Sequence, residues 1–179
     1  MISLLIDEQL GAFGWLSGPK FESQGGRPNI GLYDQRLALE WIQTNIHRFG
    51  GDPDKVTVMG ESAGAGSIAH HIVWNHEEDP ALYTPFKKAI MQSPAWVPMP
   101  DGRDDNGLQD QKYEEFLGYL QVSHLDDVLQ AQTEDLVAAN RALIANSTFG
   151  MFEASPNPFR CYSFAEQSLY RDIHDWTSH

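Results

Sequence analysis

The chain has little cysteine, no long apolar run and few positive charges. Cys161 is the single cysteine among 179 residues, so no disulfide bond can form within the chain. No stretch approaches the ~20 consecutive apolar residues that a membrane-spanning helix needs. Lysine and arginine total 12 against 25 aspartates and glutamates, for a formal net charge of −13. We therefore expect no nucleic-acid partner and no transmembrane segment.

The first residues also lack the features of a secretory signal peptide. Residues 1–6 are apolar but short, carry no basic residue, and run directly into Asp7 and Glu8. They are better explained as a β-strand over residues 2–6. Without a recognisable leader, the default expectation is a cytoplasmic protein.

What the chain does contain is an alternation of strand and helix patterns, which predicts an α/β fold with a mostly parallel sheet. Apolar residues recur with helical spacing over 31–48, and Gly50-Gly51-Asp52-Pro53 then ends that helix. Strands are expected at 55–59 and 87–92 on either side of a helix at 63–74. Later helices are predicted at 109–120, 125–130 and 133–145, with a capping box at 123–126 and Asp135 in the first turn of the last helix.

This pattern divides the chain into three parts. Residues 1–100 are interpreted as an α/β core segment and residues 101–150 as a helical, cap-like segment of the same domain. Residues 151–179 form a divergent tail without a clear period. At 41% hydrophobic residues, the chain has enough apolar material for a packed core.

The most informative motif is Gly60-Glu61-Ser62-Ala63-Gly64, which directly follows the apolar run at 56–59. A strand, then Gly-x-Ser-x-Gly, then a helix of small residues is the pattern of the nucleophile elbow in α/β-hydrolases. A side chain at Gly60 or Gly64 is expected to crowd the neighbouring helix and strand. The sharp turn would hold the Ser62 hydroxyl above the sheet, at the positive end of a helix. The alternative is that Ser62 is an ordinary N-cap serine flanked by turn glycines.

The segments around this motif resemble a known family. Residues 29–41 include Asp34-Gln35-Arg36, residues 45–53 end in the Gly-Gly-Asp-Pro turn, and the serine motif follows. Together they are similar to the type B carboxylesterase/lipase family, the cholinesterase-like branch of the α/β-hydrolases. The resemblance is strong over residues 10–93 and absent from about residue 151. It implies a partial α/β-hydrolase fold with flanking helices and a helical C-terminal part.

The resemblance also implies roles for individual residues. Ser62 corresponds to the nucleophile, and the backbone N–H of Ala63 to one oxyanion donor. Glu61 resembles a buried carboxylate that shapes the electrostatic field of the site, although an exposed turn glutamate is an alternative. Ser93 resembles a serine that forms hydrogen bonds behind the catalytic residues, and a plain strand-end serine is an equal alternative. Gly60 and Gly64 are the elbow glycines.

Other parts of a serine hydrolase are not identified in this sequence. The family's Gly-rich oxyanion loop lies upstream of the matching region, and its catalytic acid and histidine lie downstream. His70 and His71 lie on the helix after the elbow and are expected to point away from Ser62, while His174 and His179 lie in the divergent tail. The histidine pair is adjacent rather than spaced i, i+4, so no metal site is expected, and no cofactor motif is present.

Two functions from different classes follow. The first is a carboxylic ester hydrolase by lineage, acting on small-molecule or lipid esters through an acyl-enzyme, with this chain expected to be truncated and inactive alone. The alternative is a non-catalytic, hydrolase-like module that binds a partner. In either case an unpaired sheet edge is expected to favour self-association.

Overall fold

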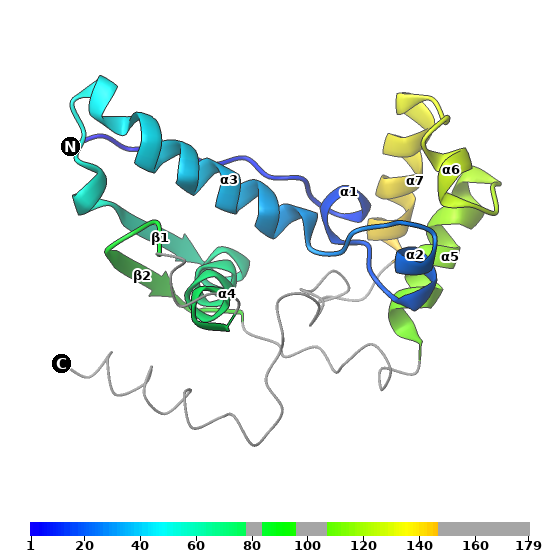
Figure 1. Ribbon diagram of the computed structural model, residues 1–179. Helices are drawn as coiled ribbons and strands as arrows, with labels where there is room; N and C mark the ends of the chain where they lie inside the picture. The colour runs from blue at the N-terminus through cyan, green and yellow to red at the C-terminus, as the bar shows by residue number, and fades with distance from the viewer. Residues whose placement is uncertain (78–83, 96–106, 147–179) are drawn as a thin grey trace, which may run out of the picture.

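The computed structural model describes residues 1–77, 84–95 and 107–146, and the tail at 151–179 lies outside them (Figure 1). The sheet region contains a two-stranded sheet and the helices packed on it, and a second region is entirely helical. The elements are α1 (Ala12–Trp15), α2 (Pro19–Ser23), α3 (Ile30–Asn45), the 3-10 helices η1 (Ile46–Phe49) and η2 (Pro53–Lys55), β1 (Thr57–Glu61), α4 (Ala63–Glu77), β2 (Lys88–Gln92), α5 (Leu108–Leu120), α6 (Leu125–Val128) and α7 (Thr133–Ala145).

The two strands are parallel, and helix α4 connects them as the crossover that parallel pairing requires. Thr57 pairs with Lys88 at one end of the ladder, and Glu61 pairs with Gln92 at the other. One face of this sheet packs on α3 and α4. Its core consists of apolar residues from both helices, from the start of η1 and from the segment before β2: Leu39, Ile42, Ile46, Ile68 and Phe86. The predicted α/β arrangement is confirmed.

No described element packs on the opposite face of the sheet, which is called the bare face below. Thr57, Met59 and Glu61 of β1 are exposed, and so is Ile90 of β2. The sequence predicts a buried central strand at 55–59. That prediction is wrong for the described residues, because β1 begins two residues later and has β2 as its single ladder partner there. The apolar residues of β1 would become buried only if a further layer covered this face.

Residues 1–10 form no helix or strand, so the predicted strand at 2–6 is wrong. The segment runs along α3 in Figure 1 and is held there by polar contacts. The backbone N–H of Gln9 donates to the carboxylate of Asp34 (3.1 Å), and the side-chain amide of Gln35 donates to Glu8. A strand needs a ladder partner, and these anchors hold the segment on a helix instead.

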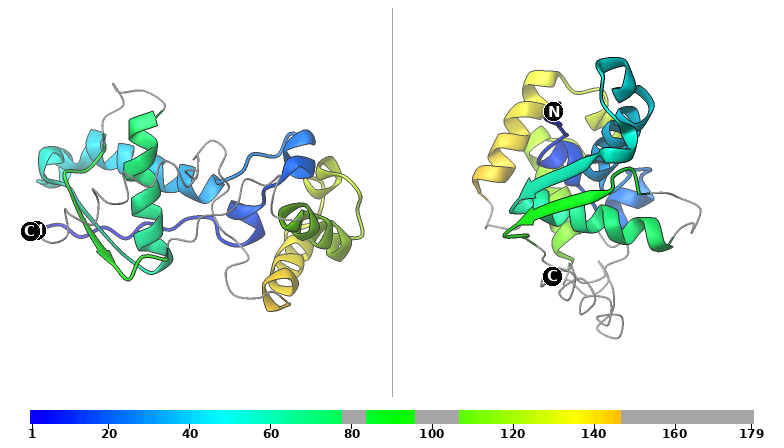
Figure 2. Two further views of the ribbon diagram at one scale, coloured as in Figure 1. Left: turned by 90° about the horizontal axis from the view of Figure 1, so that it is seen from below. Right: turned by 90° about the vertical axis from the view of Figure 1, so that its left-hand side faces the viewer.

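The helical region confirms the helices predicted after residue 100. Its core joins α5, α6 and α7 to the N-terminal helices α1 and α2 (Figure 2). Tyr113 is almost fully buried, its ring lies edge-on to Phe21 at 5.4 Å between centroids, and its hydroxyl donates to Oε1 of Gln24 (2.7 Å). Leu143 is completely buried in the same cluster. Residues from both sides of position 100 therefore share one core.

Two of the three features predicted at helix ends are present in the structure. Gly50 ends the α3–η1 run with a left-handed φ of 81°, and Asp135 lies in the first turn of α7 as predicted. The capping box predicted at 123–126 is not formed. His124, rather than Ser123, is the N-cap of α6, and it makes no side-chain capping bond. The residue types of a capping box are present one position away from the actual helix start.

Candidate active site

The turn between β1 and α4 places Ser62 in a left-handed backbone conformation, with φ of +52°. For a serine this costs about 1–2 kcal/mol, so the surrounding structure must hold it. Three backbone bonds do so. The N–H of Ser62 donates to the carbonyl of Gln92 (3.0 Å), and the carbonyl of Ser62 accepts from Gly66 (3.0 Å) and Ala95 (2.9 Å). The strained turn expected of a nucleophile elbow is therefore present, tied to the segment that follows β2.

The two elbow glycines differ in their surroundings. A Cβ atom on Gly60 would lie 2.5 Å from the carbonyl carbon of Gly64 and 2.8 Å from the backbone nitrogen of Ala65. Backbone atoms cannot move aside cheaply, so the predicted crowding at Gly60 is confirmed. A Cβ atom on Gly64 would meet nothing within 4 Å. The expectation of crowding at Gly64 is wrong in this structure, because the described segment that packs on the first turn of α4, at Ala95, meets Gly66 rather than Gly64.

Helix α4 presents its N-terminus beside Ser62. Ala63 is its first residue, and the N–H groups of a first helical turn have no partner within the helix. The N–H of Ala63 is thus a donor next to the serine, at the positive end of the helix dipole. Behind this turn Ala65 and Ser67 are buried, and the Ser67 hydroxyl donates to the Ala63 carbonyl (3.0 Å). The N-terminus of a helix is an electrostatically favourable position for a negative charge.

Ser93 occupies the position after β2 that Ser62 occupies after β1. The ladder pairs Glu61 with Gln92, so both serines follow paired residues at the carboxyl edge of the sheet. Ser93 has a similarly unusual φ of +45° and is exposed. Glu61 is exposed as well, so the burial expected for its carboxylate is not found. The exposure of Glu61 follows from its position, because Glu61 is the last residue of β1 and its side chain lies on the bare face of the sheet.

The described histidine side chains make their contacts away from the serine turn. His71 is buried on α4, and its Nε2–H donates to Oε1 of Gln35 on α3 (2.9 Å), which points its ring at α3. His47, in η1, and His124, in the helical region, are exposed. No hydrogen bond to Ser62 is found for His47, His70, His71 or His124, the histidines whose side chains the structure describes. His174 and His179 lie outside the described residues.

Burial sets the protonation of the two adjacent histidines. Desolvation lowers the pKa of His70 to about 4. Desolvation also lowers the pKa of His71 to about 3, and the nearby charges of Arg36 and His70 add to that shift. Both imidazoles are therefore neutral near pH 7. The two neutral imidazoles contribute to the packing of α4, and they supply no positive charge near Ser62.

Sequence reasoning missed the polar relay that positions α4 against α3. The Glu8 carboxylate accepts from the Gln35 amide, and the Gln35 carbonyl oxygen accepts from His71. Burial raises the pKa of Glu8, the Gln35 bond opposes that shift, and Asp34 adds to it. The relay joins three separate segments. No motif in the sequence marks it, because its members are up to 63 positions apart, from Glu8 to His71.

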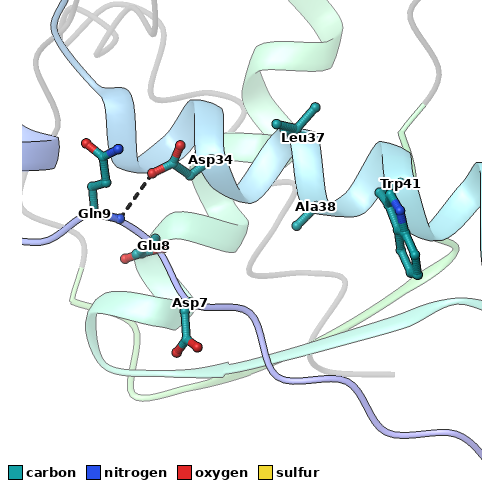
Figure 3. Close-up of a pocket in the computed structure, with 7 residues that line it drawn as sticks. All are labelled: Asp7, Glu8, Gln9, Asp34, Leu37, Ala38 and Trp41. Carbon is teal, nitrogen blue, oxygen red and sulfur yellow. Dashed lines mark hydrogen bonds between the residues drawn. The ribbon is translucent and has the colours of Figure 1, made fainter.

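A hollow of about 500 Å³ lies between the N-terminal segment and α3 (Figure 3). Figure 3 shows carboxylates at one end and Trp41 at the other. Its lining contains no residue of the elbow: Asp7, Glu8, Gln9, Asp34, Leu37, Ala38 and Trp41. In the part of the chain that the structure describes, no group of three or more His, Cys, Asp or Glu side chains is placed to bind a metal ion. No helix there is long and apolar enough to cross a membrane.

Similarity to known proteins agrees with this geometry. The chain is 48% identical over 150 residues to carboxylesterase patB of Aspergillus clavatus, covering 84% of this chain and 26% of that protein. It is 44% identical over 99 residues to lipase 5 of Diutina rugosa, covering 55% of this chain and 18% of that protein. The chain thus spans about a quarter or less of the length of these curated relatives.

Solved structures extend the match to the fold. A PNB esterase superposes with a TM-score of 0.71 at 35% sequence identity, covering 92% of this chain and 34% of the esterase. A thermophilic PNB esterase gives the same TM-score at 32% identity. The fold of the chain is therefore part of an α/β-hydrolase fold. Residues 8–159 match the model of the carboxylesterase family, and the chain belongs to this family of carboxylic ester hydrolases.

Proposed function

We propose that the chain carries the nucleophile elbow of a carboxylic ester hydrolase. Ser62 Oγ attacks the ester carbonyl, the alcohol leaves, and water then releases the acid from the acyl-enzyme. The N–H of Ala63 donates to the oxyanion, aided by the dipole of α4. The observation that carries this proposal is the left-handed turn at Ser62 between β1 and α4, in a member of the carboxylesterase family.

Small-molecule or lipid esters are the proposed substrates. The names of the relatives, a carboxylesterase and a lipase, support this class. Ser93 is proposed to support the site from the adjacent strand end, and Glu61 to contribute its charge near the serine. Both proposals rest on the position of these residues beside Ser62 at the carboxyl edge of the sheet.

Catalysis also requires a base that accepts the Ser62 proton, and the described residues supply none within hydrogen-bond distance. We therefore expect the 179-residue chain alone to be inactive. Loss of the catalytic histidine costs on the order of 10⁶ in rate in a serine protease. The purified chain should hydrolyse a p-nitrophenyl ester no faster than its Ser62→Ala variant. Rapid stoichiometric labelling of Ser62 by an organophosphorus reagent would contradict this expectation.

A chimera tests the elbow itself. Residues 10–95 of this chain would replace the corresponding segment of the PNB esterase, which supplies the remaining catalytic groups. We expect the chimera to hydrolyse p-nitrophenyl esters and Ser62→Ala to remove that activity. A folded chimera that labels with the organophosphorus reagent elsewhere, or not at all, would refute the assignment of Ser62.

The bare sheet face, and the lack of a base near Ser62 among the described residues, favour a second candidate, a non-catalytic partner-binding module. In that case a well-folded chimera would stay inactive. Its circular dichroism and melting temperature, compared with those of the parent esterase, distinguish an inactive elbow from a misfolded one.

A further inference from the structure

Three short helices in the structure are capped by side chains that lie far away in the sequence. The N-caps of α1, α2 and α6 are Gly11, Gly18 and His124, and none of them makes a side-chain capping bond. We propose that residues 11–24 and helices α5–α7 form a reciprocal latch. Each side caps helices of the other, so that the two sides gain and lose order together. The latch goes beyond the proposed enzymatic role and does not depend on it.

The helical region caps both N-terminal helices. The backbone N–H of Ala12, the first residue of α1, donates to Oδ1 of Asn140 on α7 (2.8 Å). The backbone N–H of Lys20, in the first turn of α2, donates to Oδ1 of Asp110 on α5 (2.8 Å). Such N–H groups have no partner within their own helix, and the side chain of the N-cap residue normally accepts from them. Asn140 and Asp110 do so from 128 and 90 positions away along the chain.

The two N-cap glycines leave room for these distant acceptors. A Cβ atom on Gly11 would lie 2.4 Å from Oδ1 of Asn140, and a Cβ atom on Gly18 would lie 2.7 Å from Oδ1 of Asp110. Both glycines also have a positive φ, of +60° and +109°, which glycine adopts without strain. A serine or aspartate at either position could cap its own helix, but its Cβ atom would displace the acceptor from the other side. Each glycine therefore permits a distant cap in place of a local one.

The N-terminal side caps the helical region in return. Oε1 of Gln24, at the C-cap of α2, accepts from the backbone N–H of Leu125, the first residue of α6 (2.8 Å). The same oxygen accepts from the hydroxyl of Tyr113 on α5 (2.7 Å). Gln24 thus joins the start of α6 to a buried side chain of α5. Capping bonds run in both directions between the two sides, and this is what makes the latch reciprocal.

The capped helices are too short to be stable by themselves. Helices α1 and α6 have four residues each and α2 has five, well below the ~12–15 residues at which an isolated helix is marginal in water. Apolar residues of α1, α2, α5, α6 and α7 share one core, around which these helices gather in Figure 1. No residue of that core belongs to the core of the sheet region. Loss of one bridging bond should therefore open the latch without opening the turn at Ser62.

Hydrogen exchange of the full chain, followed by mass spectrometry, tests this reciprocity. Asn140→Ala removes the cap of α1. We expect faster exchange of the backbone amides of α1, and also of α2 and α6, by about fivefold, which is the effect of one lost helix cap on an opening equilibrium. Gln24→Ala is the test from the other side, and it should speed exchange in α1 and α2 as well as in α6. The amides of β1 and α4 should keep their wild-type rates in both variants.

Two further variants separate the loss of a cap from a general loss of packing. Asn140→Asp keeps an acceptor oxygen at the same position, so its exchange should stay close to that of the wild type. Arg141→Ala, at the neighbouring exposed position of α7, is the matched control and should leave exchange unchanged. Faster exchange confined to α1 in Asn140→Ala, or to α6 in Gln24→Ala, would mean that each cap acts locally and would overturn the proposal. Equal acceleration in α4 would also overturn it, because the chain would then unfold as one unit.

Discussion

Acidification should destabilise the fold through His71, which links α4 to α3. An unfolded histidine has a pKa near 6.5, and burial lowers the pKa of folded His71 to about 3. Above pH 6.5 both states are neutral and stability is full. As the pH falls below 6.5 the unfolded chain binds a proton that the folded chain refuses, so stability is lost until the pH reaches the folded pKa.

The loss of stability depends on how far the pH falls below the pKa of the unfolded histidine. Each pH unit costs about 1.4 kcal/mol, so at pH 4.5 the loss from His71 is roughly 3 kcal/mol. His70, with a folded pKa of about 4, acts in the same direction. Glu8 acts against both, because burial raises its pKa and the folded state then takes up its proton first. A typical domain has a free energy of unfolding of only ~5–15 kcal/mol, so this loss would be a large fraction of its stability.

Urea unfolding followed by circular dichroism between about pH 7 and pH 4.5 measures this loss. His71→Gln removes the titrating group and keeps an amide that can donate to Gln35. We expect it to lower stability at neutral pH but to flatten the pH dependence. His124→Gln, at an exposed position in the helical region, is the matched control for the introduction of a glutamine. A wild-type stability that stays constant down to pH 4.5, or an unchanged slope in His71→Gln, would refute the reasoning.

Five further substitutions test the elbow and the helical core by urea unfolding. Gly60→Ala should lower the free energy of unfolding by ~2–4 kcal/mol, because the added Cβ would lie 2.5 Å from a backbone atom. Gly64→Ala adds a Cβ in open space and should change the free energy of unfolding by no more than ~1 kcal/mol. Equal effects of the two substitutions would contradict the crowding assigned to Gly60. Ser62→Gly should stabilise by ~0.5–1 kcal/mol by relieving the positive φ, and a lower melting temperature would argue against strain there. Leu143→Ala should cost ~3–5 kcal/mol from a completely buried site, and a cost below ~1 kcal/mol would mean that the core is loose. Tyr113→Phe should cost ~1–2 kcal/mol through its lost hydrogen bond, and an unchanged stability would contradict that role.

The elbow could be predicted because its determinants are local. A tight strand-to-helix turn needs a small residue where backbones approach, and the position of Gly60 in the sequence is enough to indicate it. The helices after residue 100 were equally predictable, because apolar spacing along the chain reports which face each helix buries. The family match over residues 8–159 then confirmed the resemblance read from the motifs.

Three of the wrong predictions concern neighbouring segments that a local sequence pattern cannot indicate. The segment at 2–6 has the composition of a strand, but Glu8 and Gln9 anchor it to α3 and no strand lies beside it in the described residues. Glu61 has the family's position, yet it lies on an uncovered face and is exposed. Gly64 has open space beside it, because the neighbouring segment at Ala95 meets Gly66 instead. Whether a residue is buried depends on what packs over it.

By itself the sequence determined the order of the longer helices and of the two strands from residue 30 onward, the strained serine turn and the family, because these depend on residue types a few positions apart. The tertiary structure alone decided which residues share a core and which face of the sheet stays bare. It brought Gln24 to Tyr113, and it joined Glu8, Gln35 and His71 into one relay. Contacts between distant positions form only when the chain folds, since their energy depends on distance in space.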